Sequence, residues 1–197
     1  VQLLTQQPEA LGLLSLMLHC EARRNARRQG DRYVPLSEQD VSLWDRHLIA
    51  EAEACLAEAA QWGKHTPGRF QLEAAIQSAH ASRQRSGTTD WSAIALLYEG
   101  LVRLSPTLGA QVGRAAAVAE AFGPGVGLAL LEQIGASDYQ PYWALKAHLL
   151  KRLRRSEEAS SAYLRAIGLC QDESARAFLL DAAASLSPAW TPEQLRL

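Results

Sequence analysis

The sequence lacks a long uninterrupted apolar run. Its longest apolar stretch, residues 10–20, is broken by Gly12, Ser15 and His19 and is shorter than the ~20 residues that a membrane-spanning helix needs. No secretory signal pattern is visible either. These absences predict a protein without a membrane contact.

Cysteine is scarce as well. Cys20, Cys55 and Cys170 are odd in number and lie 35 and 115 residues apart, which fits neither a disulfide framework nor a paired-cysteine metal site. A chain with so few and so widely spaced thiols is typical of a reducing compartment. We therefore expect a cytoplasmic protein.

An excess of charge of one sign is also missing. Twenty basic and 21 acidic residues leave a net charge of -1, so no overall field attracts the chain to nucleic acid or to an anionic membrane. With 48% apolar residues in 197, the chain falls in the globular class and is long enough to bury a core. Because it opens on Val1 and not on Met, we expect a piece of a longer protein.

Strand signals are nearly absent, whereas helical periodicity extends along the chain. A first helix is predicted from Pro8 to a stop near Gly30. Ser37 and Asp40 have the spacing of a capping box, which predicts a second helix of six turns over residues 37–59. A third helix is expected after Gly68.

The second half of the chain shows a repeat. Residues 93–106 and 157–170 share a pattern that places Tyr98 over Tyr163, a separation of 65. Between them, residues 125–134 place Leu131 at the equivalent position, at spacings of 33 and 32. Each of these predicted helices is followed by another, over residues 108–121, 138–153 and 173–185. Helix pairs repeating at about 34 residues are typical of tetratricopeptide arrays, in which stacked pairs bury a continuous core.

The predicted fold is therefore all-α: a helical hairpin array, forming a tetratricopeptide-like right-handed stack, with long N-terminal helices. Residues 1–86 are expected to form a three-helix segment packed on the array. Residues 87–197 are expected to supply three degenerate helix pairs, and the whole is expected to be one continuous domain.

No catalytic or metal-binding set can be assembled from these residues. His47 and Glu51 have i,i+4 spacing, but zinc needs three or four ligands and no further His or Cys pair completes the set. His80 lies on an apolar face and is interpreted as a hydrogen-bonded core residue. We predict neither enzyme activity, nor a cofactor, nor a metal. The remaining enzyme hypothesis requires a polar pocket around His80, or around Asp45 and His47.

Asp45 is predicted to lie near the core, about 50° from the centre of the apolar stripe. A carboxylate in that position needs a partner, and we expect a pair with Arg24 or Arg28 across the first two helices. The arginines of residues 21–28 could also form a site for nucleic acid or an acidic peptide. Their position near a helix end favours the simpler interpretation, that they complement the helix dipole.

Several segments together resemble a known family. They are residues 8–28, 38–54, 70–81, 89–101 and 150–167, and the most specific are Glu-Ala-Leu-Gly-Leu-Leu (9–14) and Leu-Trp-Asp-Arg (43–46). In this order they resemble the tetratricopeptide-like C-terminal extension of a group of bacterial extracytoplasmic-function sigma factors, of the sigma-70 family. Gly113 departs from that pattern, since the family has asparagine there, whereas Arg114 is kept.

The resemblance implies a regulatory, protein-interaction domain of a bacterial RNA polymerase sigma factor. It would modulate transcription initiation through contacts with the sigma core, RNA polymerase or a small protein of the YCII/DGPF type, while DNA is contacted only by upstream sigma regions absent here. The alternative is a free-standing tetratricopeptide-like, peptide-binding adaptor.

Polar residues that match the family, together with Arg28, form the candidate interaction or structural network. They are Arg23, Arg24, Arg28, Gln39, Asp40, Asp45, Arg46, Gln71, His80, Asp90 and Arg114. Trp44 and Trp91 are expected to be mostly buried packing residues.

Overall fold

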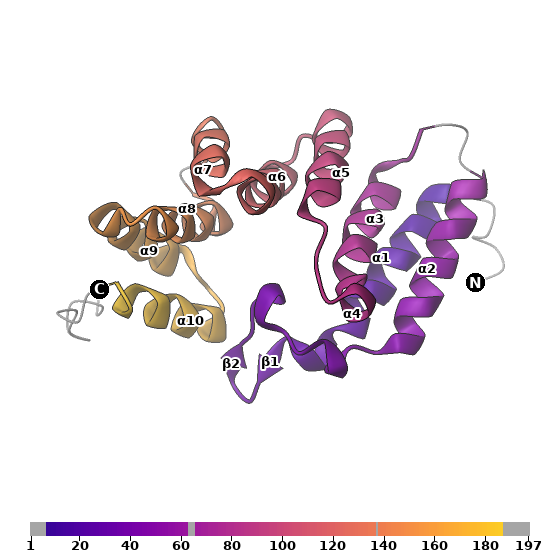
Figure 1. Ribbon diagram of the computed structural model, residues 1–197, viewed down its shortest axis with the longest axis horizontal. Coiled ribbons are helices and arrows are strands. Elements are labelled where there is room, and N and C mark those ends of the chain that lie inside the picture. The colour runs from indigo at the N-terminus through magenta and orange to yellow at the C-terminus, as the bar shows by residue number, and fades with distance from the viewer. Residues whose placement is uncertain (1–6, 63–65, 137, 187–197) are drawn as a thin grey trace. The chain divides into compact units, whose positions relative to one another are not determined.

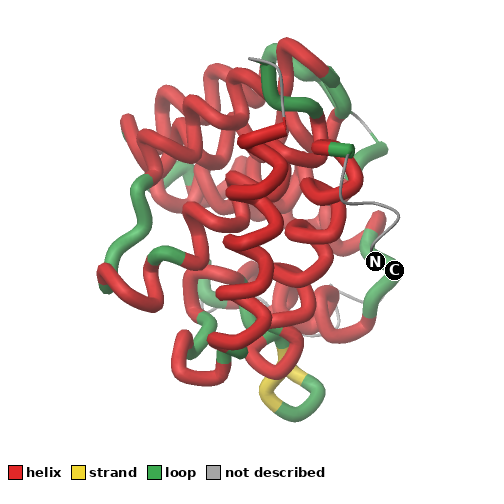
Figure 2. The backbone as a smooth tube through the Cα atoms, turned by 90° about the vertical axis from the view of Figure 1, so that its right-hand side faces the viewer, coloured by secondary structure: helices red, strands yellow, loops and turns green. Residues whose placement is uncertain are grey.

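The computed structural model describes residues 7–62, 66–136 and 138–186. Helices make up most of this described chain, and the strands β1 (Arg28–Gln29) and β2 (Arg32–Tyr33) form one small sheet (Figure 2). The predicted all-α helical array is confirmed. None of the described helices is both long enough and apolar enough to cross a membrane.

The chain divides into two compact units. Unit 1 runs up to Gln29 and continues over Val34–Ala110, and unit 2 comprises Gly30–Tyr33 and the chain from Gln111 on. The division therefore falls inside helix α6 (Leu108–Phe122).

Unit 1 is built on three neighbouring helices. Helix α1 packs against both α2 and α3, and α3 also packs against α5 (Figure 1). Short 3-10 turns lie in the connection between α1 and α2. The elements are α1 (Pro8–Ala22), η1 (Arg24–Ala26), η2 (Leu36–Glu38), η3 (Val41–Leu43), α2 (Arg46–Trp62), α3 (Arg69–Ala81), α4 (Arg83–Ser86) and α5 (Trp91–Leu104).

Two predicted helix boundaries are wrong. The first helix ends at Ala22 and not near Gly30, and the second begins at Arg46 and not at Ser37. The carboxylate of Asp40 accepts a hydrogen bond from the backbone N–H of Ser42 at 2.8 Å. Aspartate in this position stabilises a local turn that competes with a continuing α-helix.

The predicted helix after Gly68 is confirmed as α3, and the helices predicted from the repeat are also found. The chain forms α5, α6, α7 (Pro124–Glu132), α8 (Gln140–Arg152), α9 (Ser156–Leu169) and α10 (Glu173–Ala184). Leu131 and Tyr163, which the repeat aligns with each other, are 0% and 3% exposed. The repeated position is therefore a core position in unit 2.

The core of unit 2 consists of apolar side chains from its helices. Leu131, Leu149 and Ala166 are completely buried there. The sheet tip of unit 2 adds to this packing, because the ring of Tyr33 meets that of Phe178 edge to face at 5.8 Å between centroids.

Gly127 lets α7 approach α6 closely. A Cβ atom at this position would lie 2.7 Å from the carbonyl oxygen of Ala115 and would also clash with the side chain of Ala119. A Cβ atom at Gly125, in the same helix, would meet no heavy atom within 4 Å. The backbone contact between α6 and α7 therefore requires glycine at position 127 only.

We predict that Gly127→Ala destabilises the protein by about 1–3 kcal/mol, because the added methyl group overpacks a rigid helix contact. The matched variant Gly125→Ala should be neutral or more stable by up to about 1 kcal/mol, through helix propensity alone. Urea denaturation followed by circular dichroism measures both. Equal effects of the two substitutions would contradict the close approach.

Candidate functional site

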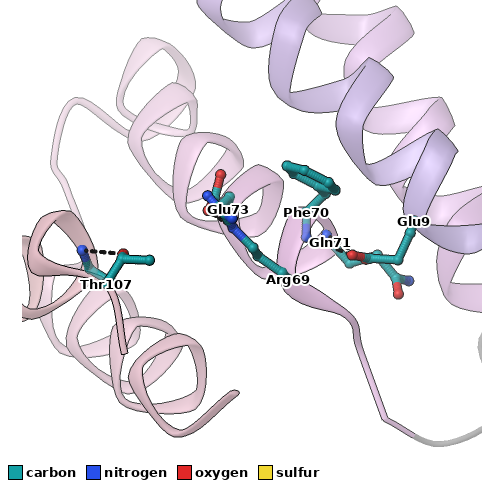
Figure 3. A network of polar contacts seen from close by, with 7 residues as sticks. Glu9, Arg69, Phe70, Gln71, Glu73 and Thr107 are labelled. Atoms are coloured by element: carbon teal, nitrogen blue, oxygen red, sulfur yellow. Dashed lines mark hydrogen bonds and ion pairs between the residues drawn. The ribbon is translucent and has the colours of Figure 1, made fainter. Parts of the chain in front are cut away.

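The predicted polar network lies largely in unit 1, and part of it joins α1 to α3. The carboxylate of Glu9 accepts hydrogen bonds from the backbone N–H groups of Phe70 at 3.1 Å and Gln71 at 3.3 Å (Figure 3). The side chain of Gln71 accepts one from the N–H of Gly68 at 2.9 Å. A negative side chain here also complements the positive end of the α3 dipole. Gln71 is therefore a helix cap.

The same joint needs a glycine on α1. A Cβ atom at Gly12 would lie 2.7 Å from the backbone nitrogen of Gln71 and 2.9 Å from the carbonyl carbon of Phe70. Glycine thus brings the α1 backbone against the first turn of α3, within reach of Glu9. Leu11, which lies between Glu9 and Gly12 in the sequence, is 4% exposed.

Trp44 is the centre of a second joint. Its side chain is 2% exposed, and the guanidinium groups of Arg83 and Arg23 lie 5.1 and 6.0 Å from the centroid of its ring. Such distances are within the range of cation–π attraction. Arg23 is buried and donates a hydrogen bond to the side-chain oxygen of Gln77 on α3. Burial is the main cause that lowers the pKa of Arg23.

Helix α4 fixes the non-helical segment that leads to Trp44. Arg83 donates hydrogen bonds to the carbonyl oxygens of Ser37 (3.0 Å), Leu36 (3.0 Å) and Gln39 (2.9 Å). Gln84 donates to two further carbonyl oxygens, those of Val41 at 2.9 Å and Trp44 at 3.2 Å. Side chains of α4 thus pair backbone carbonyl groups of this segment, of which that of Val41 also accepts a hydrogen bond from the N–H of Trp44 at 3.3 Å.

Gln39 is a buried residue of the same segment. It is 8% exposed, and its side-chain amide donates to the carbonyl oxygen of Val34 at 3.2 Å. It therefore helps to order the approach to η3.

The prediction that Asp45 lies at the core edge and pairs with Arg24 or Arg28 is wrong in its premise. Asp45 is exposed, and its carboxylate accepts hydrogen bonds from the backbone N–H groups of His47 at 2.8 Å and Leu48 at 3.1 Å. It caps α2, because that helix starts at Arg46, nine residues later than the predicted start at Ser37. Arg24 forms an ion pair with Glu21 at 3.0 Å.

Asp90 and Asp40 have a similar role. The carboxylate of Asp90 accepts from the backbone N–H of Ala93 at 2.9 Å and so caps α5. Asp40 caps η3, and its hydrogen bonds from Ser42 lower its pKa. Three aspartates of the candidate network, including Asp45, are thus satisfied at helix starts.

His80 is buried, as its apolar helix face predicts. It is 9% exposed, and its ring meets that of Trp91 edge to face at 5.3 Å. Burial, and then the positive charges of Arg23 and Arg83, lower the pKa of His80 to about 4. The imidazole is therefore neutral at physiological pH. Trp91 is half-buried and Trp44 fully buried.

The remaining candidates are arginines with more solvent exposure. Arg24, Arg28 and Arg46 are exposed, and Arg114 is half-buried. Among the described residues, no cluster of three or more His, Cys, Asp or Glu side chains is placed to hold a metal ion. The charged groups that act on the pKa of His80 are two arginines.

Sequence reasoning missed Glu9, Arg83 and Gln84 as parts of the network. The spacing of Gly68 and Gln71, together with a predicted helix start, could have indicated a capped end. Nothing in the sequence placed Glu9 beside that end, because the two partners are 61 residues apart. Arg83 donates to backbone carbonyl groups. Every residue has one, so the amino-acid types of the acceptors could not reveal these contacts.

Comparisons with known proteins give two matches. The model of a family of unknown function (DUF6596) matches residues 1–60. An uncharacterized protein of Rhizobium meliloti (strain 1021) is 39% identical over 182 residues. That alignment covers 91% of this chain but 43% of the relative, so the chain spans less than half of the relative's length. No solved structure matches.

We predict that Arg83→Lys lowers the free energy of unfolding by about 1–3 kcal/mol, because lysine cannot reproduce the planar set of hydrogen bonds to three carbonyl oxygens. Arg85 is exposed on the same short helix, so Arg85→Lys should change stability by less than about 0.5 kcal/mol. Chemical denaturation compares the two. If Arg83→Lys changes the free energy of unfolding as little as Arg85→Lys does, the hydrogen bonds from Arg83 to the three carbonyl groups do not stabilise the protein.

The pKa of His80 predicts a dependence of stability on pH. The unfolded imidazole, with a pKa near 6.5, binds a proton between pH 6.5 and 4 that the folded one does not. The free energy of unfolding should therefore fall as the pH is lowered through this window, by roughly 2–3 kcal/mol from His80. His80→Phe should reduce the fall, although buried His19 keeps its own contribution. Urea midpoints at several pH values measure this, with exposed His47→Gln as control.

Proposed function

We propose that this chain is the C-terminal regulatory, protein-interaction domain of a bacterial extracytoplasmic-function RNA polymerase sigma factor. In this role it modulates transcription initiation in the cytoplasm by contacting the sigma core, RNA polymerase or a small partner protein of the YCII/DGPF type. DNA is contacted by sigma regions elsewhere in the full-length protein. The contribution of this chain is binding and not a chemical reaction.

The length of the relative is the observation that most supports this proposal. Nearly the whole chain aligns, yet it accounts for 43% of the relative. The aligned region is therefore one part of a longer protein in that relative. That is the arrangement expected of an extension that follows a sigma core.

The structural roles of the two most specific resembling segments add support. Residues 9–14 supply Glu9 and Gly12 to the joint of α1 with α3, and residues 43–46 supply Trp44 and Asp45 to the start of α2. Residues that match the family are thus used where the helices of unit 1 meet. The segments that carry the resemblance are therefore also segments on which the packing of unit 1 depends.

The alternative is a free-standing tetratricopeptide-like adaptor that binds peptides. The succession of helices from α5 to α10, at the positions that the repeat predicts, favours an array of helix pairs in either case. The two proposals differ in what else the full-length protein contains. Sigma regions before residue 1 would exclude the adaptor.

We predict that deleting residues 1–197 from the full-length protein lowers run-off transcription severalfold, while the sigma core still binds polymerase in a pull-down. The reason is that a regulatory domain acts on initiation without forming the main polymerase contact. Restoring the residues in cis should restore transcript yield.

Unchanged transcription after the deletion would contradict the regulatory role. A gene product without sigma regions would overturn the sigma proposal and favour the adaptor. Both outcomes are read from the full-length protein: the first from its transcription after the deletion, and the second from its sequence before residue 1.

A further inference from the structure

The three cysteines of the chain lie in different electrostatic surroundings. Cys20 is half-buried in the last turn of α1, Cys55 is half-buried on α2, and Cys170 is buried directly after α9. The thiolate form of cysteine is the nucleophile, and neighbouring cations stabilise it, whereas carboxylates and burial in apolar surroundings oppose it. The charged groups near each sulfur therefore decide which of the three reacts first.

The thiol of Cys20 lies beside a guanidinium group. Its sulfur shares a side-chain hydrogen bond with the guanidinium of Arg23, three residues further along the chain. Arg27 donates a hydrogen bond from Nη2 to the backbone carbonyl oxygen of Cys20 at 2.8 Å, which brings a second positive charge to the same turn. The acidic residue next to Cys20 in the sequence, Glu21, forms an ion pair with Arg24 at 3.0 Å. The sulfur thus contacts a cation, and the adjacent carboxylate has a cation of its own.

Arg23 also carries a buried donor without a partner. Its side chain is 8% exposed, Nη2 donates to the side-chain oxygen of Gln77, and Nη1 has no hydrogen-bond partner among the described residues. Within the described chain, the groups that act on the pKa of Arg23 are Cys20, Arg27 and Arg83, and none of them is a carboxylate. A buried cation is stabilised by a negative partner in contact with it. A negative or accepting group at the Cys20 sulfur would supply that partner.

The dipole of α1 acts in the opposite direction, because it places partial negative charge at the last turn of the helix. That charge is partial and is spread over several carbonyl groups, and the carbonyl group of Cys20 itself accepts a hydrogen bond from Arg27. The guanidinium of Arg23 carries a full charge and contacts the sulfur directly. A charge-assisted hydrogen bond from a buried cation therefore outweighs the dipole at this position.

The other two thiols are less suited to ionise. Burial, and then the negative charges of Glu51 and Glu58, raise the pKa of the Cys55 thiol. Cys170 is 5% exposed, and its thiol donates a hydrogen bond to the carbonyl oxygen of Asp172 at 3.4 Å, which favours the protonated form. The chain therefore contains two internal references for the reactivity of Cys20.

We propose that Cys20 is a site of reversible oxidation by hydrogen peroxide, with Arg23 stabilising both the thiolate and the oxidised product. The thiolate sulfur attacks one peroxide oxygen, so that an S–O bond forms while the O–O bond breaks. The sulfur is oxidised by two electrons, and the peroxide is reduced. Its second oxygen leaves as hydroxide, which takes up the proton that the thiol released and becomes water.

The product is a cysteine sulfenic acid, which thiols reduce. Its oxygen is an acceptor for the Nη1 donor of Arg23, which belongs to the guanidinium that contacts the sulfur. One molecule of a small thiol condenses with the sulfenic acid to a mixed disulfide and releases water. A second molecule then attacks the mixed disulfide, so that Cys20 returns to the thiol and the two small thiols leave as a disulfide.

The test treats the purified full chain with an equimolar amount of hydrogen peroxide at neutral pH in the presence of dimedone, which forms a stable thioether with sulfenic acids. Mass spectrometry of peptides then measures the label at each cysteine over time. We expect Cys20 to be labelled about tenfold faster than Cys55 and Cys170. Addition of dithiothreitol after the peroxide and before dimedone should prevent the labelling, because it reduces the sulfenic acid.

Removal of the charge at position 23 provides the second arm. Arg23→Gln keeps a polar side chain without the charge and should slow the labelling of Cys20 by about fivefold or more, whereas Arg23→Lys keeps the charge and should retain most of the rate. Arg85→Gln makes the same change in net charge at an exposed position of α4 and should leave the rate unchanged. Circular dichroism checks that each variant is folded. If Arg23→Gln is not folded, the ratio of Cys20 to Cys55 labelling in the unaltered protein decides.

The inference is wrong if Cys20 in the unaltered protein is labelled no faster than Cys55, or if folded Arg23→Gln reacts as fast as Arg85→Gln. A product at Cys20 that carries two or three oxygen atoms and does not revert with dithiothreitol would contradict the reversible step. These outcomes are independent of the sigma proposal, which is decided by transcription with the full-length protein.

Discussion

The structure of unit 1 depends on how the non-helical backbone before Trp44 is satisfied. Residues 34–45, the last part of the connection from α1 to α2, contain only short 3-10 turns, so several of their carbonyl groups have no backbone partner within the segment. Arg83 and Gln84 supply these partners from α4. Because these carbonyl groups are satisfied, the segment can place the large indole of Trp44 in the core, close to two guanidinium groups. Helix α2 then starts directly after this segment, at Arg46.

This arrangement explains why so many residues of the candidate network are structural. Arginines beside an aromatic ring and aspartates at helix starts have the same composition as a binding site, but here their partners lie within unit 1. Arg23 reaches Gln77, and Asp45 caps α2. A polar group that already forms hydrogen bonds inside the protein has less to offer a ligand. Charged groups that stay near solvent are better placed to meet a partner than these buried ones.

The sequence was informative where local chemistry decides the structure, and it failed where distant contacts do. The helices from α5 to α10 were predicted because Pro, Gly and Asp mark their ends and because the pattern recurs. The helix predicted over residues 37–59 has the right periodicity but begins at Arg46, since Asp40 and Asp45 each stabilise a new start. The partners of Glu9 and Arg83 are 61 and more than 40 residues away, beyond any local pattern.

The same contrast bears on what each unit can recognise. In unit 1 the arginines nearest to aromatic surface are held by burial or by backbone carbonyl groups, so binding an outside carboxylate would break existing hydrogen bonds. In unit 2, Lys146 and Arg165 are held by exposed carboxylates on the surface, and exchange of one carboxylate for another conserves the number of ion pairs.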